Sequence, residues 1–110
     1  MKTISEIVSK DFKKEVLESA IPVLVDFWAP WCGPCRMVAP VVDAVSQKMN
    51  GNVKFVKLNT DENQKTAMDY QIMAIPSLLI FKDGAEVQRI VGYVSEEQLQ
   101  AELGKFVLPS

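Results

Sequence analysis

The chain has 110 residues, 48% of them hydrophobic and 24% charged, with a formal net charge of −2. This balance is typical of a globular protein, and the length predicts a single domain over residues 1–110. Acidic and basic residues are scattered, so we expect no nucleic-acid partner. No apolar run approaches the roughly 20 residues that a membrane span needs, so we also expect no membrane association.

The first ten residues are mixed in polarity and lack the apolar core of a signal peptide. The expected localisation is therefore cytoplasmic, with an organelle import segment that has already been removed as the alternative. In a reducing compartment, a lone cysteine pair is more often catalytic or metal-binding than structural. We expect the protein to be a monomer.

The first half of the chain alternates strand and helix patterns. Residues 4–8 form a short candidate strand, and Asp11 is placed to cap a helix that ends near Glu18. The apolar run from 22 to 28 is typical of a central strand that is covered on both faces. A long helix to about Met49 follows, and its apolar residues share one face: Met37, Val38, Val41, Val42, Val45 and Met49.

The second half predicts a strand over 53–58, a short polar helix over 61–70 and a hairpin. The hairpin strands are 76–81 and 85–91, and Asp83-Gly84 between them is a tight-turn signal. The segment Ser95 to Gln98 is typical of a capping box that opens a last helix. The order βαβαβαββα predicts an α/β fold with a mixed sheet and helices on both faces.

The only two cysteines lie in Trp31-Cys32-Gly33-Pro34-Cys35, between the central strand and the long helix. At the first helical turn, free N–H groups and the helix dipole favour a thiolate, so we expect a lowered pKa for Cys32. Gly33 allows close backbone approach, and Pro34 is tolerated because its missing N–H would have no partner in a first turn. Cys35 lies one turn on, and we expect it to be the more buried of the two.

This asymmetry predicts dithiol–disulfide exchange. The Cys32 thiolate attacks a substrate disulfide, and Cys35 then attacks the Cys32 sulfur and releases the reduced substrate. The electrons reside on the two sulfurs, so we expect no cofactor. A structural disulfide stays open as an alternative, although so short a loop would contribute only roughly 2 kcal/mol. A metal site is the other alternative, and it would need ligands from a second copy because the chain has no histidine and no other cysteine.

With this motif on a strand–loop–helix, the chain resembles the thioredoxin family over essentially its whole length. The resemblance is carried by residues 23–29, the pentapeptide 31–35, Lys57 with Asn59, Asp61-Glu62-Asn63, Ile75-Pro76, Asp83-Gly84 and Gly92. It implies the thioredoxin fold, a central mixed five-stranded sheet flanked by four helices. It also implies a protein-disulfide reductase that acts on disulfide-containing target proteins and is re-reduced by a separate thioredoxin reductase.

The resemblance also gives roles to two charged residues of the strands. Asp26 interrupts an apolar strand, which fits either an edge carboxylate that reaches water or a buried group with a raised pKa. In the family, the matching Asp lies beneath the resolving cysteine, so the implied role is to accept the Cys35 proton directly or through water. Lys57 is implied as the charge partner of Asp26, with a solvated strand lysine as the alternative.

The family also implies a docking surface around the cysteines. Base rates alone favour a trans Ile75–Pro76 bond, but the resemblance implies a cis bond that packs against the cysteine pair and a preceding backbone that pairs with substrate. We expect Trp31 to be an exposed contact beside Cys32, and Trp28 to be packing support under the site. Gly92 is expected to allow close approach of a target, with a simple turn role as the alternative.

Departures from the family pattern gather around this surface. Gln71 stands where Gly is frequent, and Ser77 stands where Thr is usual. Met73 and Ala74 directly precede Ile75-Pro76, which we call the proline loop. Tyr93 occupies a position commonly held by a small residue. We hypothesise that Tyr93 restricts the range of substrates, with an incidental exposed aromatic as the alternative. A disulfide oxidase or isomerase is the second functional hypothesis, and a non-catalytic interaction module is the third.

Overall fold

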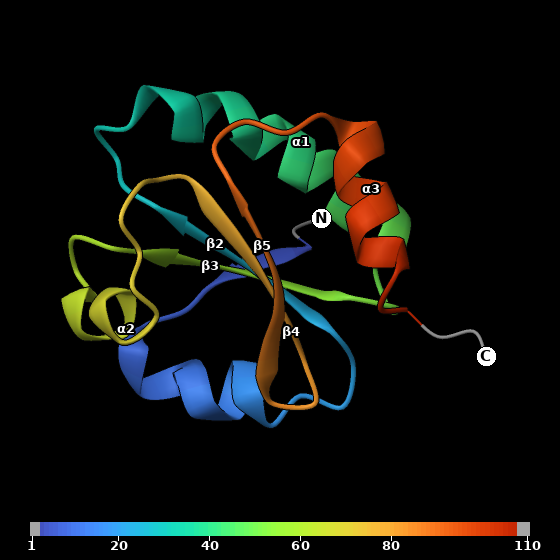
Figure 1. Cartoon of the computed structure of the whole chain (residues 1–110), viewed down its shortest axis with the longest axis horizontal. Coiled ribbons are helices and arrows are strands. Elements are labelled where there is room, and N and C mark those ends of the chain that lie inside the picture. The colour runs from blue at the N-terminus through green and yellow to red at the C-terminus, as the bar shows by residue number, and fades with distance from the viewer. Residues whose placement is uncertain (1–2, 108–110) are drawn as a thin grey trace.

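The structure is a computed structural model that describes residues 3–107. One five-stranded sheet runs through the molecule in the order β1-β3-β2-β4-β5 (Figure 1). The strands are β1 (Ile4–Glu6), β2 (Val23–Trp28), β3 (Lys54–Asn59), β4 (Ser77–Lys82) and β5 (Ala85–Val91). The first three are parallel to one another, and β4 and β5 are antiparallel to their neighbours, which confirms the predicted mixed sheet.

Helices cover both faces of this sheet. Helices α1 (Gly33–Met49) and α3 (Glu96–Gly104) lie on one side (Figure 1). The other side is covered by α2 (Gln64–Asp69) and by an N-terminal segment made of η1 (Ser9–Asp11) and η2 (Lys13–Leu17). When the N-terminal segment is counted as one helix, four helices flank the sheet, as predicted. Within residues 3–107, no helix combines the length and the apolarity that crossing a membrane requires.

The N-terminal helical segment is not the capped helix that the sequence predicts. It is a 3₁₀ turn followed by a π-helical stretch, and Asp11 ends η1 without capping either piece. Tertiary packing accounts for the difference. The centroid of the Phe12 ring lies 5.2 Å from that of Tyr70 and 5.5 Å from that of Phe81. Packing in this aromatic cluster outweighs the local preference for a regular α-helix.

Strand β2 occupies the centre of the sheet, which explains its almost uninterrupted apolar sequence. Residues 23–27 are all buried because β2 has neighbours on both edges and helices over both faces. Side chains alternate between the two faces along a strand. Leu24 packs in the cluster under α1 and α3, whereas Val23, Val25 and Phe27 pack in the cluster on the other face. Asp26, two residues from Leu24, therefore faces α1.

Two local predictions in the second half are confirmed. Asp83 and Gly84 both have positive φ, +53° and +82°, as a two-residue type I′ hairpin turn requires. At the start of α3, the Gln98 N–H donates to Ser95 Oγ at 3.2 Å and the Ser95 N–H donates to Gln98 Oε1 at 3.2 Å. This reciprocal pair is the predicted capping box.

Candidate active site

The two cysteines lie at the junction between the end of β2 and the start of α1. Cys32 is the N-cap residue of α1, and Pro34 lies in its first turn. Cys32 and Cys35 are joined by a disulfide bond with a Cα–Cα distance of 5.3 Å. The Cys35 N–H, one of the free donors of the helix end, points at Cys32 Sγ from 3.1 Å. A negative charge on that sulfur would therefore be stabilised by both an N–H group and the helix dipole.

The prediction that Cys35 is the more buried cysteine is wrong for this disulfide form. Cys32 is 3% exposed and Cys35 is 4% exposed. The physical reason is that the closed disulfide packs both residues into one small cluster with Ala29, against Trp28 and Ile75. The difference between the sulfurs lies in what surrounds them and not in their exposure.

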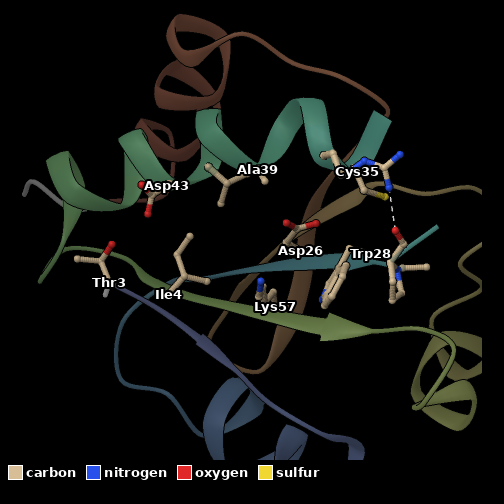
Figure 2. A pocket seen from close by; sticks show the side chains of 12 residues that line it. Thr3, Ile4, Asp26, Trp28, Cys35, Ala39, Asp43 and Lys57 are labelled. Carbon is tan, nitrogen blue, oxygen red and sulfur yellow. Dashed lines mark hydrogen bonds between the residues drawn. The ribbon is translucent and has the colours of Figure 1, made fainter. Parts of the chain in front are cut away.

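Asp26 lies on the Cys35 side of the disulfide, in the wall of a pocket of about 540 Å³ beneath α1 (Figure 2). The pocket is lined by Thr3, Ile4, Asp26, Trp28, Ala29, Pro30, Cys35, Arg36, Ala39, Val42, Asp43 and Lys57. Asp26 is 6% exposed, and its Oδ1 has no hydrogen-bond partner among the described residues. The alternative of an edge carboxylate is therefore wrong, and the predicted burial is confirmed.

Burial also raises the pKa of Asp26, from its ordinary value of 3.8 to about 7. The positive charge of Lys57 opposes this rise, and the negative charge of Glu6 adds to it. A carboxyl with a pKa near neutrality can both accept and release a proton at physiological pH.

Lys57 is the register neighbour of Asp26 across β2 and β3, but the two do not form a direct ion pair within the described residues. The Lys57 Nζ lies 3.8 Å from Glu6 Oε1 and 4.7 Å from the centre of the Trp28 ring. Lys57 therefore acts on Asp26 through space. Sequence reasoning missed Glu6, because only the parallel register of β1 and β3 brings it to Lys57.

The loop before β4 lies on the other side of the disulfide. The Ile75–Pro76 peptide bond is cis, which confirms the form implied by the family resemblance. The Ile75 carbonyl oxygen lies 3.7 Å from Cys32 Sγ. Pro76 is buried, and its carbonyl accepts a 2.8 Å hydrogen bond from the Gly92 N–H. Gly92 has a φ of +92°, so its backbone conformation requires glycine, while a Cβ there would contact nothing in the chain.

Exposed apolar side chains surround this loop and the cysteine pair. Trp31 is exposed, as predicted, and its Nε1 donates to Asp61 Oδ2 at 2.8 Å. Tyr93 is 57% exposed and Met73 is almost fully exposed. Trp28, by contrast, is half-buried in the pocket wall and packs against the cysteine cluster.

The backbone at Gln71 shows why the family frequently has glycine at this position. Its φ is +53°, in the left-handed region that glycine adopts without strain. Glycine is therefore favoured at this position because it adopts a positive φ at little cost. Arg89 Nη1 donates to the Gln71 carbonyl at 3.3 Å, and Arg89 Nη2 donates to the Tyr70 carbonyl at 2.7 Å, which holds this turn against β5.

A family model described as thioredoxin matches residues 3–105. The chain belongs to the thioredoxin family. The thioredoxin of Synechocystis sp. (strain ATCC 27184 / PCC 6803 / Kazusa) is 55% identical over 97% of this chain and 100% of that protein. Thioredoxin 1 of Synechococcus elongatus is 56% identical over 96% of this chain and 98% of its own length. The chloroplastic M-type thioredoxin of Spinacia oleracea is 41% identical over 99% of this chain and 60% of that protein.

Family membership and the bonded cysteine pair together establish the chemistry. The protein is a thiol–disulfide oxidoreductase that reduces protein disulfides by dithiol–disulfide exchange. These findings favour a reductase over a pure interaction module. Within residues 3–107, no group of three or more His, Cys, Asp or Glu side chains is placed to hold a metal ion.

Proposed function

We propose that Cys32 is the attacking cysteine of this reductase and Cys35 the resolving one. The observation that carries the assignment is the Cys35 N–H at 3.1 Å from Cys32 Sγ, because it stabilises a thiolate on Cys32 and not on Cys35. Cys32 also faces the proline loop, where the Ile75 carbonyl lies 3.7 Å from its sulfur.

In the first step, the Cys32 thiolate attacks one sulfur of a target disulfide. The target S–S bond breaks, a mixed disulfide forms with Cys32, and the departing target sulfur leaves as a thiolate. In the second step, Cys35 loses its proton and attacks Cys32 Sγ. The mixed disulfide breaks, the second target thiolate leaves, and the Cys32–Cys35 disulfide remains. Two electrons have then passed to the target.

Asp26 is the proposed acceptor of the Cys35 proton. Both residues line the same pocket, and the buried Asp26 carboxyl has an Oδ1 with no hydrogen-bond partner among the described residues (Figure 2). A pKa of about 7 suits a group that must take a proton and later release it at neutral pH. The pocket is large enough for water to carry the proton between the two groups.

Targets dock, in this proposal, on the face beside Cys32. The backbone of Ile75 and Pro76 offers a place for an extended target segment, with Trp31 on one side and Gly92 and Tyr93 on the other. Gly33 and Pro34 complete this surface, and a Cβ at Gly33 would contact nothing within the chain, which leaves room for a partner. Trp28 supports the site from below.

The proposed electron donor is a thioredoxin reductase, and the proposed location is the cytoplasm. The thioredoxin family supports the donor, because its members are re-reduced between turnovers. The need for re-reduction supports the location, because the cysteine pair must return to the dithiol form to act again and the cytoplasm is a reducing compartment. In this proposal, residues 1–110 belong to one domain that acts as a monomer and needs no resident cofactor.

Trapping with single cysteine variants tests the assignment. Cys35→Ser should reduce insulin disulfides poorly and accumulate mixed disulfides through Cys32, whereas Cys32→Ser should form none. Mass spectrometry of adducts formed with insulin identifies the linked cysteine. Adducts that form equally well on Cys32→Ser, through Cys35, would reject the assignment. A pure interaction module would bind partners without turnover in the wild type.

A further inference from the structure

Three charged side chains form one row of the sheet next to the cysteine pair. Glu6 on β1, Lys57 on β3 and Asp26 on β2 are register partners in parallel strands. Register partners in neighbouring strands project from the same face of a sheet. The row therefore places one ammonium between two carboxyl groups, and the position of that ammonium decides which carboxyl it stabilises.

The ammonium lies on the Glu6 side. Lys57 Nζ is 3.8 Å from Glu6 Oε1, and within residues 3–107 it makes no ion pair with Asp26. The other oxygen, Glu6 Oε2, accepts a 3.1 Å hydrogen bond from Trp28 Nε1. Lys57 Nζ also lies 4.7 Å from the centre of the Trp28 ring, a cation–π distance. One carboxylate thus contacts both groups that flank Asp26 in the pocket.

We infer that Glu6 is a positioning residue of the reductase, whose carboxylate holds Lys57 and Trp28 at the pocket edge and leaves the Asp26 carboxyl free to accept a proton. The inference rests on the proposed function, because the role of Asp26 as proton acceptor belongs to that proposal. Without the Glu6 charge, the Lys57 ammonium would be free to turn toward Asp26 and stabilise its carboxylate, which makes a weaker base.

The charges around Asp26 agree with this geometry. Burial raises the pKa of Asp26, Lys57 lowers it and Glu6 raises it. From α1, Arg36 and Asp43 line the same pocket, and so does Cys35. From β4, the residue opposite Asp26 is the uncharged Leu78. Glu6 is thus the acidic member of the charged row that contacts Lys57 directly.

Solvent exposure limits the size of the effect and makes it sensitive to salt. The side chains of Lys57 and Glu6 are 41% and 44% exposed, so their interaction is partly screened by water and by ions. The effect should be largest at low ionic strength and should fall as salt is added.

The test is a titration of the Asp26 carboxyl in the oxidised protein, followed by carbon-13 NMR of its side chain. Glu6→Gln removes the charge but keeps an oxygen that can accept from Trp28 Nε1. We expect its Asp26 midpoint to fall by on the order of 0.3 pH unit at low salt, and by less at high salt. Glu6→Asp should restore the wild-type midpoint.

Two comparisons isolate the route of the effect. Glu18→Gln removes the same charge from an exposed 3.9 Å ion pair with Lys13 and should leave the Asp26 midpoint unchanged. In a Lys57→Met background, Glu6→Gln should shift the midpoint by clearly less than in the wild type, because Glu6 then has no ammonium to hold.

An unchanged midpoint in Glu6→Gln overturns the inference, and so does an undiminished shift in the Lys57→Met background. The titration uses oxidised protein and needs no turnover, so either result leaves the proposed function intact. Conversely, full disulfide-exchange activity in Asp26→Asn would reject Asp26 as the proton acceptor. The effect of Glu6→Gln on the Asp26 midpoint is measured in protein that keeps Asp26, so it would stand.

Discussion

The surroundings of the Cys32–Cys35 disulfide differ on its two sides in solvent exposure, polarity and charge. The Cys32 side is an exposed apolar face built around the proline loop, with Trp31, Met73 and Tyr93 on its surface. The Cys35 side is a pocket with a buried carboxyl and several charges. The difference indicates a division of labour, in which one side selects the target and the other handles the proton. Variants on the two sides should therefore fail in different ways.

The largest expected effect on the pocket side comes from Asp26→Ala. Because the folded pKa of about 7 lies above the ordinary 3.8, the folded state binds this proton more tightly than the unfolded state. The stability that the protonated carboxyl provides is complete below about pH 4 and is lost as pH rises to about 7. At pH 8, Asp26→Ala should stabilise the fold by on the order of 2–4 kcal/mol.

The same variant should slow disulfide exchange by about 100-fold near neutral pH, which is typical for loss of a general base. Urea unfolding at pH 5 and pH 8, together with insulin reduction, measures both effects. Asp43→Ala is a matched control, because Asp43 lines the same pocket but is exposed on α1, and it should change neither quantity appreciably. A less stable and fully active Asp26→Ala would contradict the assignment.

A smaller effect is expected on the docking side from Tyr93→Ala. If the exposed Tyr93 ring narrows the surface beside Gly92, its removal should raise kcat/KM for bulky protein disulfides by several-fold, while small disulfides change little. The pH profile of the reaction should stay that of the wild type, because the Cys35 side is untouched. Equal rates for Tyr93→Ala and wild type across several protein disulfides would show that the ring is incidental.

The smallest effect, a change in stability, is expected from Gln71→Gly, in the turn that precedes the Ile75–Pro76 loop. Gln71 adopts a φ of +53°, and glycine relieves that strain. We expect a gain of about 0.5–1 kcal/mol in the free energy of unfolding, after allowance for the greater chain entropy of glycine. Thermal unfolding measures it. Ala67→Gly, inside α2, should instead lose stability, and the reverse order would refute the strain.

Features that depend on local sequence were predictable. The unbroken apolar run of β2, the Asp83-Gly84 turn and the Ser95 capping box each carry their cause within a few residues. The position of Cys32 at the start of α1 is of the same kind, since Pro34 marks the first helical turn.

Features that depend on contacts between distant segments were not predictable. The irregular N-terminal helix reflects the packing of Phe12 on Tyr70 and Phe81. The equal burial of the cysteines reflects the closed disulfide cluster. The contact of Lys57 with Glu6 reflects the register of β1 against β3, which no local pattern records. Asp26 lies between these cases, because its burial follows from the strand pattern but its partners do not.

The difference in reactivity between Cys32 and Cys35 is tested most directly by the rate at which iodoacetamide alkylates each thiol of the reduced protein at pH 7, followed by peptide mass spectrometry. We expect Cys32 to react at least about 10-fold faster than Cys35, because the helix end stabilises only the Cys32 thiolate. Equal rates for the two cysteines would contradict it.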